Sequence, residues 1–477
     1  MNILALEVST SSAKSIIYST EKGVIDSYSL TFDSKVGDVA IQDPEKVIKK
    51  IINCAKKVLQ NKDFNIEIIG LSSTWHSFLL LDKNRKPITK IRTWADTSAY
   101  RTVNKYKSDK NLYYNIYKKT GCPIHSLYPL WKWIDFRENN NTSSLNNIYL
   151  SSKPEYIFEY LTGEIAVSKS VASGSGFMNI HDINWDKDIL DLAKININQL
   201  SKLKNIDFSA PLKNNIAEEL GLKNGTPVII TGPDGALNQI GSGALKNKIM
   251  TLSVGTSGAI RMVTPKPLIP KEPSTWCYYV GDNKRLAGAA TSGAGNCIEW
   301  FKNDINNNQF TLDVLNKKAQ NIKKSNAPIF LPFLYGERCP GWQDEKKGGF
   351  CELKGTHNLD HLYYSILEGI LFNLYQSYKI LVNVDDKPSS IKISGGIVNS
   401  DFWLQMAADI FQKNIIISKI KDASLMGVIA ICLKKTGYII DLEEFEPEAG
   451  GTINFNKDNI DLYNRRYKKY LKWYNVD

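Results

Sequence analysis

The chain has 477 residues, of which 43% are hydrophobic and 23% charged, a composition that excludes disordered, collagen-like and coiled-coil proteins. Its length suits about two to four domains. The amino terminus runs from Met1 into a short strand-like stretch without the basic and apolar regions of a signal peptide. No apolar run approaches the roughly 18 residues that a membrane helix needs. We therefore expect a globular, cytoplasmic protein with no membrane partner.

The chain carries 60 Lys and Arg against 49 Asp and Glu, a net charge of +11. A surplus of this kind can indicate a polyanionic partner. The lysines are spread along the chain among many asparagines, however, which indicates a general compositional bias and no nucleic-acid site. The seven cysteines form no CxxC and no Cys/His spacing suited to zinc, so we expect reduced, structural thiols.

An octapeptide near the amino terminus recurs at about half the chain length. Residues 6–13 read LEVSTSSA and residues 252–259 read LSVGTSGA. Each copy follows one apolar run and precedes another, which predicts a strand, a small-residue turn and a second strand. Such a turn lets backbone N–H groups and hydroxyls approach phosphate oxygens. Either copy alone is compatible with an ordinary hairpin, but the repeat predicts two similar domains, 1–245 and 246–477, each opening with a phosphate-facing turn.

Two polar sites follow strand-like segments of the first half. Trp75 and His76 come after the apolar run 66–72, and Asp96 lies in the segment Thr-Trp-Ala-Asp at 93–96. A polyol ligand needs an aromatic face, hydrogen-bond donors and a carboxylate acceptor, which these three side chains supply. The alternatives remain a structural histidine and an aspartate that serves only in a turn.

Asp234 follows the buried-strand run 227–231 through a Gly-Pro turn. This position exposes a carboxylate at the carboxyl end of a strand, where it can serve as a base, or equally as the N-cap of the helix expected over 236–245. Ligands of open α/β sheets bind at such strand ends.

The second half continues the α/β pattern. We expect a buried helix over 361–382, a strand over 390–394 and a helix over 399–411. A further strand is expected over 414–417, and a helix capped by Asp422 that runs to about 435. Gly395, Gly396 and Asn399 stand between a strand and a helix, as in a nucleotide-contacting turn. The polar segment 139–147 is expected to be a surface loop. The sequence has no GxxxxGK[ST], HExxH or convincing GxSxG pattern, which disfavours P-loop NTPases, zincins and serine hydrolases.

Taken together, the motifs resemble the FGGY family of sugar kinases, which share the two-domain ATPase fold of actin and hexokinase. The match spans nearly the whole chain, and its elements stand in family order at residues 7–13, 73–76, 94–96, 232–235, 255–258, 336–340, 395–409 and 422–427. The segments SSxxHS, TWAD, DGAL and GTSGAIR are most similar to gluconate kinases, and xylulose kinases come next. The resemblance implies an α/β fold of two actin/hexokinase-like (ribonuclease H-like) domains with a cleft between them.

The resemblance also implies a function. The N-terminal domain would bind the sugar and the C-terminal domain the nucleotide, and the enzyme would transfer the γ-phosphoryl group of ATP to a hydroxyl of a sugar or sugar acid. Asp234 would be the general base. Gluconate is the first candidate substrate because Arg261 and His76 could suit its carboxylate, and xylulose or another ketose or polyol is the alternative. The sequence leaves open whether the protein forms a homodimer.

Further roles follow residue by residue from the resemblance. The sugar would be bound by Trp75, His76, Asp96 and Asp234. ATP would be bound by Thr10, Ser11, Lys14, Gly255, Thr256, Ser257, Gly395, Gly396 and Asn399. Mg²⁺ would be bound by Glu7 and Asp234.

The chain departs from the family pattern in four segments. The first turn has Glu7 and Ser9 where Asp and Gly are usual, the segment after Trp94 lacks an arginine, Trp75 replaces a methionine, and Asp135 stands where a tryptophan is common. Three of the four departures lie on the sugar side, so the phosphoryl-transfer chemistry is better supported than the identity of the sugar. Glu7 and Ser9 also motivate an alternative of another class, a nucleotide-binding sensor with little catalytic activity.

Overall fold

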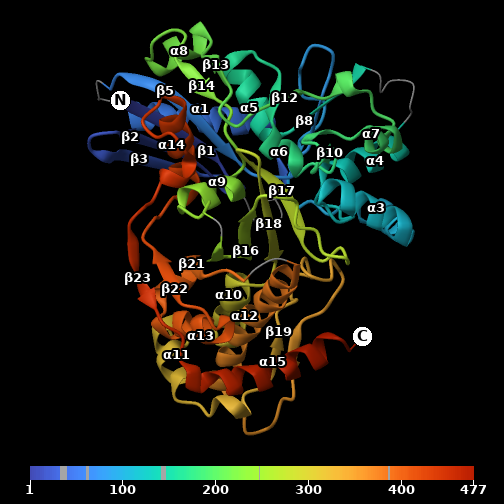
Figure 1. The fold of residues 1–477 in the computed structure, drawn as a ribbon, viewed down its shortest axis with the longest axis vertical. Coiled ribbons are helices and arrows are strands. Elements are labelled where there is room, and N and C mark those ends of the chain that lie inside the picture. Colours follow the sequence, from blue (N-terminus) through green and yellow to red (C-terminus); the bar gives the residue numbers. More distant parts are fainter. Residues whose placement is uncertain (33–39, 61–63, 141–146, 247, 385–386, 477) are drawn as a thin grey trace.

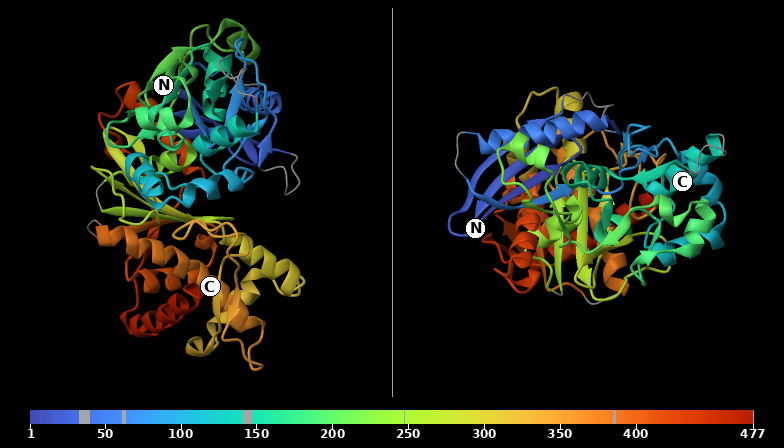
Figure 2. Two further views of the ribbon diagram at one scale, coloured as in Figure 1. Left: turned by 90° about the vertical axis from the view of Figure 1, so that its right-hand side faces the viewer. Right: turned by 90° about the horizontal axis from the view of Figure 1, so that it is seen from above.

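The computed structural model describes residues 1–32, 40–60, 64–140, 147–246, 248–384 and 387–476. The chain forms two lobes, each built around a mixed β-sheet, and Figures 1 and 2 show the N-terminal lobe stacked on the C-terminal one. In the described part of the chain, no helix is long and apolar enough to span a bilayer.

The N-terminal sheet has six strands. Their spatial order is β13 (Ser209–Pro211), β14 (Pro227–Ile229), β5 (Ile66–Ser73), β1 (Asn2–Val8), β2 (Ser12–Ser19) and β3 (Gly23–Thr31). β1 pairs antiparallel with β2 and parallel with β5. Helices cover both faces, so β1 is an almost unbroken apolar run whose residues from Ile3 onward are all buried.

The C-terminal sheet has seven strands. Their order is β17 (Trp276–Gly281), β18 (Lys284–Thr291), β16 (Gly258–Thr264), β15 (Ile249–Val254), β21 (Ser390–Gly395), β22 (Ile415–Ser418) and β23 (Ala449–Ile453). β15 pairs antiparallel with β16 and parallel with β21, which repeats the arrangement of β2, β1 and β5. The edge strand β17 contacts the N-terminal lobe, where Cys277 N donates to Gly121 O and Tyr279 N donates to Ser173 Oγ.

Both repeated octapeptides form the predicted hairpins, in registers that differ by one residue. Val8 pairs with Ala13, whereas Val254 pairs with Gly258. The first turn therefore holds one residue more than the second. Ser9 closes this longer turn, because its hydroxyl accepts from Ser12 N at 3.0 Å and from Ser11 N at 3.3 Å.

One helix of the second half of the sequence packs in the N-terminal lobe. α14 (Ala423–Lys435) lies against β1, β5 and α9 (Asp234–Gly241), as Figure 1 shows. The two helices touch backbone to backbone: a Cβ on Gly241 would lie 1.9 Å from Ala423 O, and one on Gly427 would lie 2.1 Å from Leu237 O. Only glycine permits this approach. The second half of the chain is thus anchored in the N-terminal lobe by a close contact between α9 and α14.

The remaining helices flank the sheets. α1 (Pro44–Leu59) covers the outer face of the N-terminal sheet behind an Asp43 N-cap that accepts from Glu45 N and Lys46 N. The other helices are α2 (Tyr100–Lys107), α3 (Lys110–Thr120), α4 (Pro129–Asn139), α5 (Lys153–Thr162), α6 (Lys169–Ser173), α7 (Lys187–Ala193), α8 (Asn214–Leu220), α10 (Gly295–Trp300), α11 (Leu312–Gln320), α12 (Leu359–Val384), α13 (Asp401–Phe411) and α15 (Ile460–Tyr474).

Short two-stranded ladders complete the structure. They pair β4 (Ile41–Gln42) with β7 (Ile91–Arg92), β6 (Leu79–Leu81) with β8 (Tyr149–Ser151), β9 (Ala166–Ser168) with β12 (Lys202–Lys204), β10 (Met178–Asn179) with β11 (Asn184–Trp185), and β19 (Ile329–Leu331) with β20 (Gly349–Cys351).

Most predicted elements are confirmed within a few residues, including the buried helix α12 and the strands β5, β21 and β22. The helix after Asp234 ends earlier than predicted, at Gly241, and Gly243 has a positive φ of 61°. Asp422 is the N-cap residue of α14, as predicted, but its side chain makes no capping hydrogen bond and pairs with Lys14 instead. Most of the predicted loop 139–147 lies outside the described residues.

Candidate active site

The predicted site residues of the first half lie at the carboxyl ends of neighbouring strands. β1 ends at Val8, and Ser73 at the end of β5 pairs with it and forms a bridge to Pro233. This bridge places Asp234 beside Trp75. The predicted base and the predicted sugar-side residues are therefore neighbours.

Asp234 is the first residue of α9, where its Oδ1 accepts from Gly235 N at 2.8 Å. Burial raises the pKa of the Asp234 carboxyl. The Gly235 N–H, the positive charges of Arg261 and Lys153, and a hydrogen bond from the Trp75 N–H oppose that rise. A carboxylate with a raised pKa is a better proton acceptor at neutral pH, which suits a general base.

Glu7 is a second buried carboxylate at the same point, near the end of β1. Ser72 Oγ donates to Glu7 Oε1 at 2.9 Å, and the Ser424 hydroxyl of α14 donates to the same side chain. Burial raises the pKa of Glu7, and the nearby negative charge of Asp234 raises it further. Like charges that lie this close favour a cation between them.

The two carboxylates fit a magnesium ion that shares its coordination with phosphate. Among the described residues, no group of three or more His, Cys, Asp or Glu side chains is arranged to hold a metal ion. Protein Mg²⁺ sites of nucleotide-dependent enzymes typically take only one or two carboxylates and fill the remaining positions with water and phosphate oxygens. Glu7 and Asp234 match that donor set.

A buried lysine for which the sequence predicts no role holds the backbone of the first turn by hydrogen bonds. Lys153, at the start of α5, is fully buried. Its Nζ donates to Ser9 O at 3.0 Å and to Gln42 Oε1 at 3.1 Å, while Gln42 Nε2 donates to Thr10 O at 2.8 Å. Burial lowers the pKa of Lys153 to about 7, although Asp234 and Glu7 act against this. No local pattern around Lys153 indicates this role.

Two further contacts hold the first turn. Trp94 Nε1 donates to Thr10 Oγ1 at 3.0 Å, which links the predicted sugar-side segment to the predicted phosphate turn. Lys14 Nζ pairs with Asp422 Oδ1 at 2.7 Å, immediately before α14. Burial alone would lower the pKa of Lys14, but the interaction with Asp422 raises it. Ser11 is exposed at the tip of the turn.

The second turn and the predicted adenosine-side residues lie at adjacent strand ends. Gly255 N donates to Ser257 O at 3.0 Å, and Thr256 O accepts from Asn296 N. Gly395 pairs with Val254 and has a φ of 91°, and a Cβ there would lie 2.4 Å from Val254 O. Gly395, Gly396 and Asn399 are exposed. The structure thus brings both predicted nucleotide-side segments of the C-terminal lobe together.

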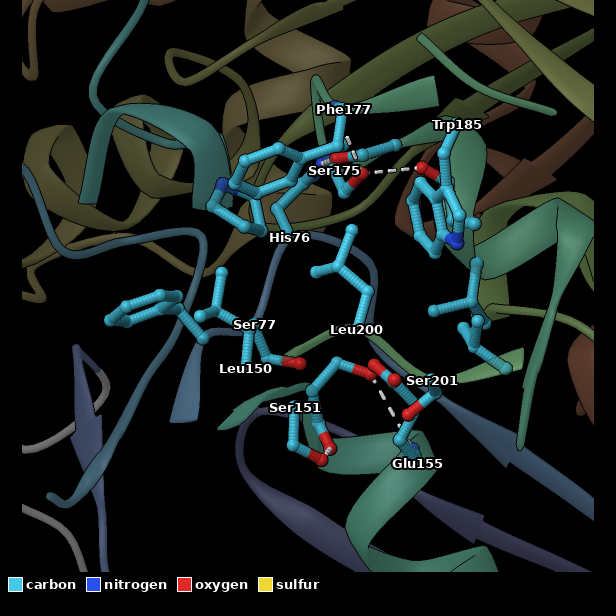
Figure 3. A pocket seen from close by; sticks show the side chains of 17 residues that line it. His76, Ser77, Leu150, Ser151, Glu155, Ser175, Phe177, Trp185, Leu200 and Ser201 are labelled. Carbon is cyan, nitrogen blue, oxygen red and sulfur yellow. Dashed lines mark hydrogen bonds between the residues drawn. The ribbon is translucent and has the colours of Figure 1, made fainter. Parts of the chain in front are cut away.

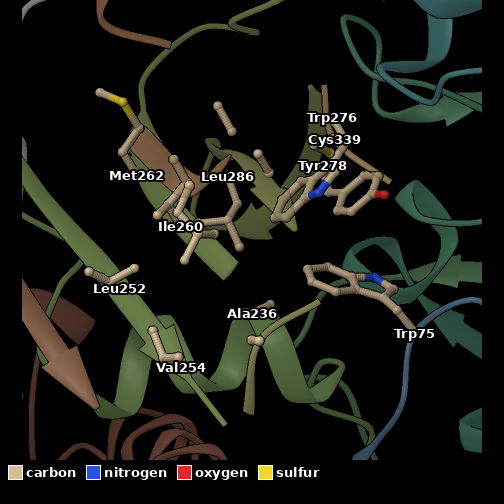
Figure 4. Close-up of a cluster of buried hydrophobic side chains, with 14 of the residues drawn as sticks. Trp75, Ala236, Leu252, Val254, Ile260, Met262, Trp276, Tyr278, Leu286 and Cys339 are labelled. Atoms are coloured by element: carbon tan, nitrogen blue, oxygen red, sulfur yellow. The ribbon is translucent and has the colours of Figure 1, made fainter. Parts of the chain in front are cut away.

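Trp75 and His76 belong to an aromatic cluster between the lobes. Figure 4 shows the Trp75 ring facing Trp276 and Tyr278, and its centroid lies 4.8 Å from that of Tyr278. His76 Nδ1 lies 2.6 Å from Gly174 O, so Nδ1 carries the proton and Nε2 is an acceptor. Burial lowers the pKa of His76 well below its usual value. A neutral His76 suits a hydroxyl, not a carboxylate.

Asp96 is clamped by an arginine from an unexpected position. Its Oδ2 accepts from Arg92 Nε, and its Oδ1 accepts from Ser98 Oγ at 2.7 Å and from Ser98 N at 3.1 Å. Burial alone would raise the pKa of the Asp96 carboxyl, but these hydrogen bonds lower it. Arg92 Nη2 also donates to Ser98 Oγ. The segment after Asp96 has no arginine, and the arginine that pairs with Asp96 is Arg92, four residues before it.

Two cavities lie near the predicted sugar residues. One of about 520 Å³ lies between Thr97 and α2 on one side and residues 342–346 of the C-terminal lobe on the other, and Asp96 itself does not line it. It falls in the size range of small-molecule sites. The other, of about 40 Å³, lies behind His76 and is lined by Ser77, Glu155 and Ser201 among others, as Figure 3 shows. The small cavity has room for about one or two water molecules only.

Comparison with known proteins places these features in a family. Two family models match, described as the N-terminal and C-terminal domains of the FGGY family of carbohydrate kinases, at residues 2–241 and 250–435. The chain is 31% identical to a gluconokinase of Bacillus subtilis over 467 residues, which covers 94% of this chain and 90% of that protein.

Two solved structures of similar proteins come from Lactobacillus acidophilus. A gluconate kinase superposes with a TM-score of 0.94 at 29% identity, over 99% of this chain and 97% of that one. A xylulose kinase superposes with a TM-score of 0.93, also at 29% identity, over 99% and 98%. These matches confirm the predicted two-domain fold and an ATP-dependent sugar kinase activity. The chain belongs to the FGGY family of carbohydrate kinases.

Proposed function

We propose that this kinase phosphorylates a sugar acid, with gluconate as the first candidate, and that Asp234 is its general base. The observation that carries the proposal is the environment of Asp234, a buried carboxylate at the start of α9 whose pKa is raised and which interacts with the charges of Glu7, Arg261 and Lys153. The similar gluconokinase and gluconate kinase support the choice of substrate.

In the proposed reaction, the Asp234 carboxylate accepts the proton of the substrate hydroxyl as its oxygen attacks the γ-phosphorus of ATP. The hydroxyl must lie within about 2.6 to 3.2 Å of that carboxylate. Glu7 and Asp234 would hold Mg²⁺, which supplies charge neutralisation at the phosphates. Trp75, His76 and Asp96 would bind the polyol.

The ATP phosphates would lie between the two turns. Backbone N–H groups and hydroxyls of Thr10, Ser11, Gly255, Thr256 and Ser257 would contact them, with the Lys14 ammonium nearby. Gly395, Gly396 and Asn399 would border the adenosine. In this assignment residues 1–245 bind the sugar and residues 246–477 bind the nucleotide.

The test is release of ADP from Mg-ATP with gluconate, xylulose, ribulose and glycerol. Asp234→Asn should lower kcat by about three orders of magnitude or more and leave ATP binding intact. Asp109→Asn is the matched control, because Asp109 is an exposed N-cap of α3 and asparagine caps equally well. Near-normal turnover by the Asp234 variant would contradict the base assignment.

Metal binding has its own readout. Mn²⁺ can replace Mg²⁺ as a paramagnetic probe, and its binding in the presence of ADP can be followed by electron paramagnetic resonance. Glu7→Gln should weaken Mn²⁺ binding by about tenfold or more, since a carboxylate ligand is lost. Unchanged Mn²⁺ affinity would remove Glu7 from the metal site.

A neutral ketose such as xylulose is the second candidate substrate, because the xylulose kinase structure superposes almost as well as that of the gluconate kinase. Turnover of xylulose in preference to gluconate would select it. The kinase relatives count against the sensor with little activity that Glu7 and Ser9 suggested.

A further inference from the structure

Two arginines between the lobes have unused hydrogen-bond donors. Arg261 lies on β16, and Arg338 lies in the segment 336–340 after β19. The Nε atoms of both are buried and have no hydrogen-bond partner. In the part of the chain that the structure describes, Arg261 makes one side-chain hydrogen bond, from Nη1 to Ser253 Oγ at 3.2 Å, and neither arginine forms an ion pair within 4.0 Å.

The acidic side chains nearest to Arg338 in sequence are engaged elsewhere. Glu337 accepts from the Tyr474 hydroxyl at 2.7 Å and pairs with Lys346. Asp344 pairs with His125 Nε2 at 2.9 Å. Asp344 still attracts Arg338, whose charge helps to lower the pKa of the Asp344 carboxyl, but among the described residues no carboxylate lies within 4.0 Å of the Arg338 guanidinium.

The two guanidinium groups lie on the sugar side of Asp234. Arg261 Nε would be 3.5 Å from a Cβ on Gly235, the residue after Asp234. The Arg338 guanidinium lies over the Trp94 ring, 5.6 Å from its centroid, and its charge acts on His76 and Arg261. Burial lowers the pKa of Arg261 to about 10, and repulsion by Arg338 adds to this against the attraction of Asp234.

Leaving such a pair unneutralised is costly. The two cations repel one another, and although both side chains are partly exposed, their Nε–H groups are buried and each unused donor adds a desolvation cost. A ligand that brings a negative charge and two acceptor oxygens in one plane would relieve both costs, since a guanidinium fork matches a carboxylate. A neutral polyol would satisfy the unused N–H donors but would not neutralise the positive charges.

We propose that Arg338, together with Arg261, forms a carboxylate subsite that selects sugar acids over neutral sugars. The subsite rests on the proposed function, because the reacting hydroxyl must reach Asp234 and the acid end of the same molecule then lies toward Trp94. The carboxylate contact falls to the arginines, since His76 is neutral.

The experiment compares gluconate with glucitol, which carries a CH₂OH group in place of the carboxylate. Arg338→Gln should raise KM for gluconate and lower kcat/KM by about 10² or more, in the range seen when one partner of a desolvated charge pair is removed. KM for ATP should not change, and the preference for gluconate over glucitol should collapse. Arg261→Gln should act in the same direction.

Two further variants secure the comparison. Arg338→Lys keeps the charge without the planar fork and should retain part of the gluconate preference, and it serves if the glutamine variant does not fold. Arg101→Gln is the matched control, because Arg101 is exposed on α2 and its guanidinium contacts the neighbouring Tyr100. It should leave both substrates unaffected.

The outcomes separate the subsite from the function it rests on. Turnover of neutral sugars only by the wild-type enzyme would overturn the substrate proposal and the subsite with it. A wild-type preference for gluconate that persists in the Arg338 variants would leave the substrate standing and overturn the subsite. Equal losses with gluconate and glucitol, or a raised KM for ATP, would assign the arginines to phosphate binding and would also overturn it.

Discussion

Lys153→Met is expected to stabilise the protein at neutral pH and to make its stability less dependent on pH. Lys153 is fully buried, and its ammonium donates hydrogen bonds to the Ser9 carbonyl and the Gln42 amide oxygen. Its pKa falls from 10.5 to about 7 in the fold. At about 1.4 kcal/mol for each pH unit, the charged form costs on the order of 5 kcal/mol relative to the unfolded chain.

The direction in which stability changes with pH follows from the number of protons bound in the folded and unfolded states. Between about pH 7 and 10.5 the unfolded state carries a proton on Lys153 that the folded state has lost, so the stability of the wild type rises with pH across this window. Below pH 7 the full cost of burying the charged ammonium applies, and above pH 10.5 this cost disappears. Methionine removes the cost at every pH but gives up two hydrogen bonds, worth about 1 to 1.5 kcal/mol each.

The assay is urea unfolding at pH 7.5 and pH 9.5. The increase in unfolding free energy between these pH values should be about 2 to 3 kcal/mol larger in the wild type than in Lys153→Met. Lys46→Met is the control, because Lys46 is exposed on α1 and its charge stays in water in both states. An equal pH dependence in the wild type and the Lys153 variant would refute the reasoning.

The same variant should raise KM for ATP, since Ser9 and Gln42 lose the hydrogen bonds that Lys153 donates to them.

Two further substitutions test the first turn and the contact between α9 and α14. Ser9→Gly should free the N–H groups of residues 11 and 12 that the Ser9 hydroxyl now occupies, and it should tighten ATP binding several-fold by calorimetry; weaker binding would contradict this. Gly241→Ala would place a Cβ 1.9 Å from Ala423 O and should cost about 3 kcal/mol or more in thermal unfolding. Gly355→Ala, where the added carbon meets nothing within 4 Å, should cost far less, and equal losses would count against the helix contact.

The sequence alone determined the features that depend on neighbouring residues. Alternation and apolar runs predict β1, β2, β15 and β16, and small residues between them predict the two turns. The Gly-Pro segment after β14 predicts that Asp234 follows a strand end directly. Each of these depends on local geometry, which a short stretch of residues specifies.

Only the tertiary structure decided which distant residues complete the site. Lys153 reaches Ser9 across 144 positions, and Lys14 reaches Asp422 across 408. Arg92 pairs with Asp96 because a turn folds the chain back on itself between them. Such contacts arise when separate elements pack together, and the burial that shifts the pKa values of Lys153 and Glu7 exists only then.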